Sequence, residues 1–296
     1  MMSARFLTVV LERAFNMRDG FGREIDYMRI SVIDSCNLNC YYCNPCDNNE
    51  HCHALNILSV KEVLCIVRAA TRLGIKHFRL TGGEPLLHPQ LDEMVLQIKK
   101  IPGVSSVSLT TNAVLLAQHA KWLKEAGIDS INVSLDTIDA SEYERITKKP
   151  LLEEVKHGIN AAIECGIRVK INVVLTPQTD VVALTRYVAK KGTDIRFIEM
   201  MPVGEGRTNG VEPYKKVIGT LSKLYGEPCR INTEKTKEIN SGNDKRKIPD
   251  NGPAEYYIFP ELGIRVGLIQ AIHGKFCDIC NRIRVTADGR LMPCLG

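Results

Sequence analysis

The sequence predicts an α/β protein: a partial (β/α)6 barrel of the TIM type, followed by a small β-rich region that carries cysteines. Between residues 27 and 201, six apolar, β-branched runs alternate with longer segments of helical periodicity. Such alternation requires a parallel sheet with helical crossovers. The pattern stops after Met201, and 296 residues fit one barrel of about 250 residues with an appendage. We therefore expect a barrel domain over 20–201 and a C-terminal region over 202–296.

The individual elements follow in chain order. The first strand is predicted over 27–34, and the first crossover helix begins at the N-cap Ser59 and ends at Gly74. The remaining strands are expected over 76–81, 104–111, 130–137, 168–176 and 194–201, and the remaining helices over 89–101, 114–127, about 141–147, 151–165 and 180–192.

Two segments outside this alternation have simpler interpretations. The first sixteen residues contain a short apolar patch that Glu12 and Arg13 interrupt, so we expect a helix and not a signal peptide. Residues 234–252 are polar and rich in charge, which is typical of a solvated loop or hairpin tip.

Composition excludes several classes of protein. The chain is 44% hydrophobic and 25% charged, as in soluble globular proteins, and no apolar run reaches the ~18 residues of a membrane span. Its net charge of +5 is too small to indicate nucleic-acid binding, but it leaves cations for an anionic ligand. The eleven cysteines in a chain with long helices indicate reduced thiols for metal or redox chemistry, and hence a cytoplasmic protein.

Three cysteines follow the first strand in the run "SCNLNCYYC". Cys36, Cys40 and Cys43 have the spacing C-x3-C-x2-C, and three thiolates on one short loop can hold three corners of an iron–sulfur cubane. Structural zinc is the alternative, since it takes four ligands. Four further candidate ligands follow shortly after: Cys46, His51, Cys52 and His53. The spacing favours the cluster, and it leaves open whether Cys43 or Cys46 completes it.

A second cysteine set closes the chain. Cys277, Cys280 and Cys294 are one ligand fewer than a metal site normally has. Arg282 and Arg284 stand two residues apart between them, so they share a face if this stretch is extended. Guanidinium groups suit phosphate oxygens, and the pair therefore indicates an anionic ligand.

The run "TGGEP" follows the second strand. Its adjacent glycines, Gly82 and Gly83, can let a ligand approach the backbone closely, and Glu84 can accept from an ammonium group. Paired glycines alone are a weak indication of a ligand site. Their combination with the neighbouring cysteine loop is specific.

This combination resembles the radical S-adenosylmethionine (SAM) enzymes. The segments "FGREIDYMRISVIDSCNLNCYYC", "FRLTGGEPLL", "LTTNA", "INVSLDT", "VKINVVL", "IRFIEMMPVGEG" and "CDICNRIRVTADGRLMPC" are similar, in this order, to the GTP 3′,8-cyclases of molybdenum-cofactor biosynthesis. The resemblance implies two [4Fe-4S] clusters. The first binds SAM through an open iron and yields a 5′-deoxyadenosyl radical, whereas the second, in an iron–sulfur C-terminal appendage, faces the purine of GTP. It implies no catalytic side chain beyond the two clusters.

The resemblance also implies ligand contacts. Positions matched to SAM are Tyr42, Gly83, Ser134 and Met201, with Glu84 and Asn172 beside them. Positions matched to GTP are Arg29, Arg79, Thr110, Lys170, Arg282 and Arg284, with His77 and Arg196 as further candidates. A charged side chain that points from a strand into a barrel is costly without a partner, which independently favours an anion beside Arg29 and Arg79. Arg196 has Glu199 as an alternative partner.

Three departures from the family pattern stand out. His77 replaces a lysine, although alternation keeps it on the face of Arg79, and Ala113 replaces a glycine. The sequence also ends at Gly296, before the flexible paired-glycine tail with which family members end. We therefore expect this chain to bind GTP and SAM but to form the cyclised product slowly or not at all.

The expected function is radical cyclisation of GTP, by hydrogen abstraction at the ribose 3′ carbon and attack on guanine C8. The expected partners are GTP and an unidentified reductant protein, with a homodimer as a possible assembly and neither nucleic acid nor membrane. One alternative is a radical enzyme with an auxiliary cluster that acts on a peptide, and another is a non-catalytic metal-binding protein. The paired arginines argue against the first alternative, and the GGEP motif beside the cysteine loop argues against the second.

Overall fold

The computed structural model describes residues 17–43, 56–200, 213–231, 252–274 and 276–294. The predicted helix over 1–16 and almost all of the predicted loop over 234–252 lie outside these ranges. So do Met201, Cys46 and Cys52.

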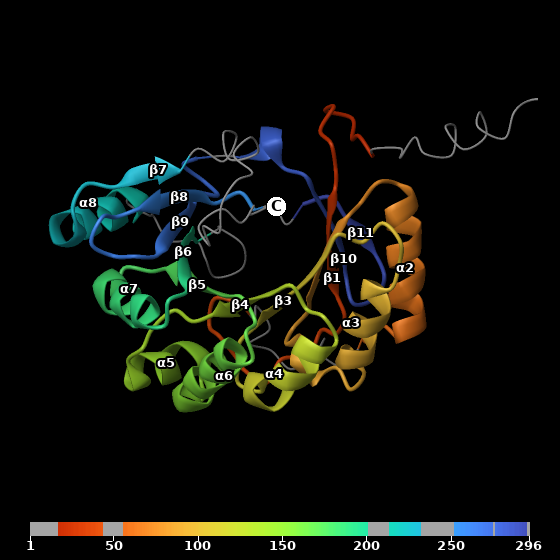
Figure 1. Cartoon of the computed structure of the whole chain (residues 1–296), viewed down its shortest axis with the longest axis horizontal. Helices are drawn as coiled ribbons and strands as arrows, with labels where there is room; N and C mark the ends of the chain where they lie inside the picture. Colours follow the sequence, from red (N-terminus) through yellow and green to blue (C-terminus); the bar gives the residue numbers. More distant parts are fainter. Residues whose placement is uncertain (1–16, 44–55, 201–212, 232–251, 275, 295–296) are drawn as a thin grey trace, which may run out of the picture.

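Six parallel strands and their crossover helices confirm the predicted fold class. The strands are β1 (Tyr27–Ser31), β2 (His77–Thr81), β3 (Ser106–Thr111), β4 (Ser130–Ser134), β5 (Val169–Leu175) and β6 (Asp194–Glu199). The helices are α2 (Val60–Arg72), α3 (Leu91–Lys99), α4 (Leu116–Glu125), α5 (Ala140–Thr147), α6 (Leu152–Glu164) and α7 (Val181–Lys190), with the 3-10 turn η1 (Pro85–Leu87) before α3. The helices lie along the outside of a curved sheet (Figure 1).

The first crossover helix begins and ends where the sequence predicts. The Ser59 hydroxyl accepts a hydrogen bond from the Glu62 N–H, and the Glu62 carboxylate accepts one from the Ser59 N–H, which forms a capping box. Gly74 follows the helix with a φ of 90°, a left-handed conformation that glycine adopts without steric cost.

The C-terminal region extends the barrel sheet at both of its edges. Its elements are α8 (Pro213–Tyr225), β7 (Cys229–Ile231), β8 (Glu255–Ile258), β9 (Arg265–Ile269), η3 (Cys277–Ile279), β10 (Arg282–Val285) and β11 (Leu291–Met292). The strand order is β11-β10-β1-β2-β3-β4-β5-β6-β9-β8-β7. Both β10 and β9 run parallel to their barrel neighbours, β1 and β6. Neither these pairings nor α8 was predicted from the sequence.

The two faces of the sheet differ sharply in polarity. Successive strand residues alternate between faces, and Ile30, Leu80 and Val133 belong to the apolar core on the helix-covered face. The opposite, inner face carries polar and charged side chains. In the strand register, every predicted GTP contact falls on this inner face.

Among the described helices, none is long and apolar enough to cross a membrane.

Candidate functional site

The first cysteine set lies on the loop that leaves the C-terminal end of β1. Burial raises the pKa of all three thiols, and that of Cys40 reaches about 12 because Cys43, Asp136 and Cys36 add negative charge nearby. Thiolates in such a setting need a positively charged group, and metal ligation deprotonates cysteine. The loop therefore fits a group that is held by three thiolates.

Two anchors hold this loop against the barrel. The Asn39 N–H donates to the Thr147 carbonyl at the end of α5, over 3.0 Å. The Tyr42 hydroxyl makes a short hydrogen bond to Asp136, whose other oxygen accepts from the Val174 N–H at 2.7 Å. Burial raises the pKa of Asp136 to about 6, although both hydrogen bonds favour its ionised form. The loop conformation thus depends on a carboxylate that lies far from it in sequence.

The paired glycines are required by the backbone beside them. A Cβ on Gly83 would lie 2.0 Å from the Ser35 carbonyl oxygen, and one on Gly82 would lie 2.2 Å from that of Ile33. The Gly83 N–H also donates to the Ile33 carbonyl at 2.7 Å. The sequence interpretation attributed the glycines to close approach by a ligand, whereas here their missing side chains make room for the chain that leads into the cysteine loop. Contact between Gly83 and SAM remains a prediction.

Glu84 is 1% exposed, and its carboxylate connects three segments. One oxygen accepts from the Leu86 N–H at 3.0 Å and from the Thr111 hydroxyl at 2.6 Å. The other oxygen accepts from the Asn112 N–H at 2.7 Å, and the Asn112 amide in turn donates to Asn37 of the cysteine loop at 2.7 Å. A carboxylate has about four acceptor sites, so one remains for the ammonium group that the sequence predicts.

The second cysteine set lies at the opposite end of the strands. Because β10 is parallel to β1, Cys277 and Cys280 precede it at the N-terminal end of the sheet. The antiparallel strand β11 then brings Cys294 back to the same end. The Arg23 guanidinium donates to the Cys277 carbonyl at 2.6 Å. Burial and the charge of its arginine neighbour lower the pKa of Arg284, which the thiolates of Cys294 and Cys280 partly offset, so these groups lie near one another.

The spacing of the cysteines bears on the choice of metal. Within the described ranges, no three His, Cys, Asp or Glu side chains are close enough to hold one metal ion. A zinc ion with Zn–S bonds of about 2.3 Å draws its sulfurs together around a single centre, whereas a cubane spreads its thiolates over separate iron atoms. The assignment of iron–sulfur clusters to the two cysteine sets stays a prediction from the sequence. The choice between Cys43 and Cys46 stays open, since Cys46 lies outside the described residues.

Four arginines from three neighbouring strands gather on the inner face. Arg29 lies in register between Arg79 and Arg284, and Arg282 lies opposite Tyr27. Burial, and then the charges of Arg79 and Arg282, lower the pKa of Arg29 to about 9. The Nε atoms of Arg29 and Arg282 are buried and have no hydrogen-bond partner among the described residues. Like charges with unused donors are costly, and a bound anion removes that cost.

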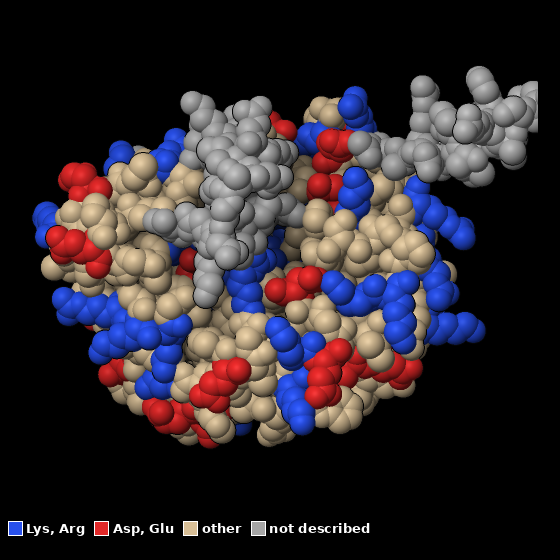
Figure 2. Space-filling model, in the orientation of Figure 1, with Lys and Arg blue, Asp and Glu red and all other residues tan. Residues whose placement is uncertain are grey.

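Figure 2 shows Lys and Arg side chains at the centre of the face in view. Beside the arginines, His77 lies on the inner face as predicted, and its Nδ1 is 2.8 Å from the Ser106 hydroxyl. Burial lowers the pKa of His77, so the ring favours its neutral form. Arg79 donates from Nε to the Ser108 hydroxyl at 3.0 Å. His77 is thus a neutral group where the family has a lysine.

Polar groups on the far side of the inner face are paired with one another. Lys170 is buried beneath the ring of Tyr256, 6.0 Å from its centroid. Arg196 is also buried, and its Nε donates to the side-chain amide oxygen Oδ1 of Asn172 at 2.9 Å. Glu199, the alternative partner of Arg196, instead accepts from the backbone N–H and ring of His273.

The remaining predicted contacts are distributed along the same face. Thr110 and Ser134 lie on the inner face in register with β4 and β5, and Ser134 is exposed at the end of its strand. Ala113 has a φ of 65°, which explains why the family has glycine here. Met201 lies outside the described residues.

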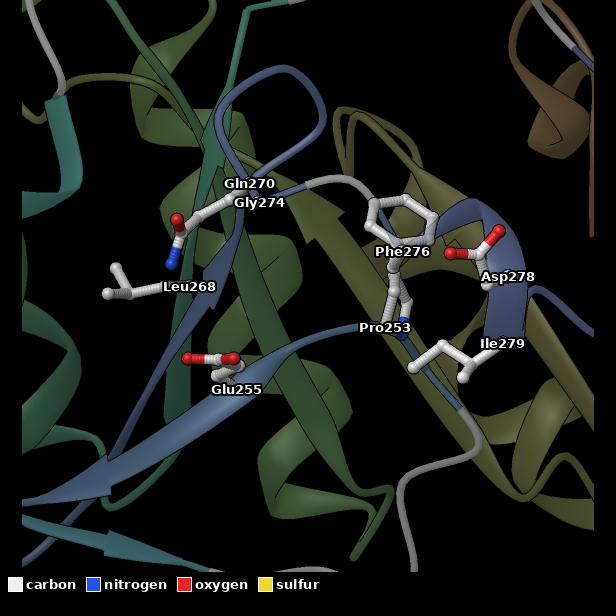
Figure 3. A pocket seen from close by; sticks show the side chains of 8 residues that line it. All are labelled: Pro253, Glu255, Leu268, Gln270, Gly274, Phe276, Asp278 and Ile279. Atoms are coloured by element: carbon white, nitrogen blue, oxygen red, sulfur yellow. The ribbon is translucent and has the colours of Figure 1, made fainter.

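A separate hollow of about 230 Å³ lies beside the second cysteine loop (Figure 3). It is lined by Pro253, Glu255, Leu268, Gln270, Gly274, Phe276, Asp278 and Ile279. Two of these side chains, Glu255 and Asp278, are carboxylates, and their negative charge repels a phosphate. The inner face with its arginines is the better candidate for an anion.

Three residues with structural roles in the site were not identified from the sequence. Asp136 and Asn112 hold the first cysteine loop, and Glu199 holds the segment that leads to the second. All three lie at or just beyond the C-terminal end of a parallel strand. That position was the available signal, because functional groups in barrels concentrate at these strand ends.

Comparison with known proteins identifies both parts of the chain. Residues 30–183 match the Radical SAM superfamily, and residues 193–296 match the family model Molybdenum Cofactor Synthesis C. A GTP 3′,8-cyclase of Clostridium perfringens is 37% identical over 282 residues, which cover 94% of this chain and 83% of the relative. A GTP 3′,8-cyclase of Pelotomaculum thermopropionicum is 38% identical over 286 residues, covering 94% and 84%.

Solved structures share the fold at low sequence identity. Streptococcus suis SuiB bound to S-adenosylmethionine matches with a TM-score of 0.64 at 14% identity, over 92% of this chain and 60% of SuiB. Methylornithine synthase (PylB) matches with a TM-score of 0.53 at 16% identity, over 77% of this chain and 71% of that protein. These structures share the fold, and the family models with the sequence relatives show that the chain belongs to the radical SAM superfamily and, within it, to the GTP 3′,8-cyclase family.

Proposed function

We propose that this chain converts GTP to 3′,8-cyclo-7,8-dihydroguanosine triphosphate, a step of molybdenum-cofactor biosynthesis. The observation that carries the proposal is the set of four arginines on the inner face between the two cysteine sets. β1 has five residues, so at about 3.3 Å per residue the four steps between its end residues span roughly 13 Å. A nucleoside triphosphate can lie on the inner face with its phosphates against the arginines.

The arginines supply binding and orientation. Arg29 and Arg282 each have a buried Nε that is available as a donor, and guanidinium groups bind phosphate oxygens in fixed geometry. The arginines are partly buried, and a charge-assisted contact is stronger there than in bulk water. A substrate fixed in this way presents the same ribose carbon to the reacting group at each turnover.

The cysteine sets are the proposed holders of the cofactors. Cys36, Cys40 and Cys43 would ligate the first [4Fe-4S] cluster, and Cys277, Cys280 and Cys294 would ligate the second. With SAM bound, the first cluster supplies the radical chemistry that removes hydrogen from the ribose 3′ carbon. The proposed SAM contacts are Tyr42, Gly83, Glu84, Ser134, Asn172 and Met201.

The arginine set also separates this function from peptide modification. A peptide backbone is neutral, and it gives no reason to gather four guanidinium groups on one face. We propose further that the protein acts in the cytoplasm, receives electrons from a reductant protein and can form a homodimer.

The decisive experiment follows one hydrogen atom. The chain is first reconstituted anaerobically with iron and sulfide. It is then chemically reduced in the presence of SAM and of GTP that carries deuterium at the ribose 3′ carbon. We expect deuterium in the 5′-deoxyadenosine that is released, as measured by mass spectrometry. Unlabelled 5′-deoxyadenosine under these conditions would contradict the proposed site of abstraction.

A binding measurement tests the arginines independently of turnover. GTP should bind more tightly than guanosine, and Arg282→Ala should reduce that difference. Arg68→Ala, which alters an exposed arginine on α2, is the matched control and should have no effect. Equal binding of GTP and guanosine by the unaltered protein would show that the phosphates do not meet the arginines.

A further inference from the structure

Asn132, in the middle of β4, is a buried polar side chain without a partner. It is 1% exposed, and neither its Nδ2 nor its Oδ1 forms a hydrogen bond to any described residue. Two other asparagines of the barrel use their amides: Asn112 donates to Asn37, and Asn172 accepts from Arg196. Burying an unpaired donor and an unpaired acceptor together is costly, so Asn132 requires an explanation.

The position of Asn132 indicates where its partner lies. Ile131 and Val133 belong to the apolar core, so Asn132 between them points to the inner face. In register it lies between Thr110 on β3 and Lys170 on β5, both of which are proposed GTP contacts. An apolar side chain would fill this position at lower cost, and the fold therefore gives no reason for an amide here.

The chemistry of the amide narrows the partner. Phosphate oxygens only accept hydrogen bonds, so a phosphate would leave the Asn132 carbonyl oxygen unpaired. A pair of neighbouring hydroxyl groups can satisfy both amide atoms, because one hydroxyl donates to the carbonyl and the other accepts from the NH2 group. β4 lies two strands from β2, roughly 10 Å across the sheet, which is comparable with the span of a triphosphate chain. With phosphates at the arginines, the ribose of the nucleotide falls near Asn132.

We propose that Asn132 binds the ribose 2′ and 3′ hydroxyl groups of the substrate, and that it makes the site selective for ribonucleotides over deoxyribonucleotides. This inference rests on the proposed function. It assigns recognition of the sugar to β4, which lies two strands from the arginine-bearing strand β2. The 3′ carbon of this sugar is the proposed site of reaction.

The test compares ligands that differ in single groups. Dissociation constants for GTP, 2′-deoxyGTP, 3′-deoxyGTP and inosine triphosphate are measured on the reconstituted protein and on Asn132→Leu. We expect the unaltered protein to prefer GTP over both deoxy analogues by about tenfold, as the loss of one or two hydrogen bonds implies. In Asn132→Leu this preference should disappear, while the preference for GTP over guanosine remains. Asn160→Leu on α6 is the control for the same substitution elsewhere.

Stability provides a readout that separates binding from structure. Since Leu removes an unpaired donor and acceptor, Asn132→Leu should leave the melting temperature of the ligand-free protein unchanged or raise it. If the variant does not fold, the inference is wrong, because the amide is then structural. Asn132→Ser, which keeps one hydroxyl, should show an intermediate preference for GTP over the deoxy analogues.

Other outcomes would also overturn the inference. Unchanged discrimination in Asn132→Leu excludes contact with the ribose. Loss of discrimination against inosine triphosphate alone would mean that the amide reads the guanine base, and weakened SAM binding alone would move it to the cofactor. Failure of the unaltered protein to bind GTP would reject the proposed function itself, and this inference with it.

Discussion

The two cysteine sets are built in different ways. Cys36, Cys40 and Cys43 come from one continuous loop at the C-terminal end of β1, and partial burial raises the pKa values of their thiols. The second set lies at the other end of the same strands, and Cys294 reaches Cys280 through the β10–β11 hairpin. The first set is therefore a local motif, since its three cysteines lie on one loop. The second set comes together only when β10 and β11 have paired at the edge of the sheet.

The strongest test of this difference removes one cysteine from each set. Cys40→Ala should lower the iron content from about eight to about four atoms per chain and abolish cleavage of SAM. Cys280→Ala should cause a similar loss of iron but leave cleavage of SAM in place. Iron analysis and 5′-deoxyadenosine release measure both effects, with Cys65→Ala as the control. If either substitution empties both sites, the two sets are not independent.

A second comparison separates Arg29, whose Nε has no partner among the described residues, from a paired arginine on the same face. Arg29→Ala should weaken GTP binding by about 1.5–3 kcal/mol, which is typical of a lost charge-assisted contact. Arg265 lies at the other edge of the barrel and is bound to Asp194. Arg265→Ala should lower the free energy of unfolding without changing GTP affinity. GTP affinity is measured by calorimetry and the free energy of unfolding by urea denaturation, for both variants. If Arg265→Ala weakened GTP binding and Arg29→Ala lowered only stability, the roles assigned to the two arginines would be wrong.

The anchor of the first loop predicts a smaller effect on stability. Asp136→Ala leaves the Val174 N–H and the Tyr42 hydroxyl without their shared acceptor, which should cost about 1–3 kcal/mol of unfolding free energy. Tyr42→Phe removes one of these hydrogen bonds and should cost less. Both variants should still assemble the second cluster, as judged by iron content. Equal loss of both clusters in Asp136→Ala would indicate that the whole barrel depends on this carboxylate.

The smallest effect is expected at Ala113. A non-glycine residue with a φ of 65° is strained by roughly 1–2 kcal/mol, and glycine also loses more conformational freedom on folding. Ala113→Gly should therefore raise the free energy of unfolding by at most about 1 kcal/mol. Ala126→Gly at the end of α4 is the comparison that should destabilise instead. A fall in stability for Ala113→Gly would show that the backbone here is not strained.

Most of the fold and the composition of the site could be predicted from local patterns. Period-2 alternation predicted that His77 shares a face with Arg79, and both lie in β2 as this requires; the register then adds Arg29 to the same face. The anchors could not be predicted, because the partner of Tyr42 is chosen by the packing of β4 against the loop. Likewise, the sequence indicated glycines beside a ligand, whereas the backbone of Ile33 and Ser35 occupies that space.

The sequence by itself therefore determined the six β/α units, the two cysteine sets and the charges on the inner face, because each depends on the spacing of nearby residues. The tertiary structure alone decided that β9 and β10 continue the barrel at its two edges. It also decided that Cys294 returns to the same end of the sheet as Cys280, and that Asn132 is buried between strands without a partner in the part of the chain that the structure describes. The pairing of β9 and β10 depends on which strand edges remain open for hydrogen bonding once the barrel has formed. The local periodicity of the sequence does not specify which edges those are.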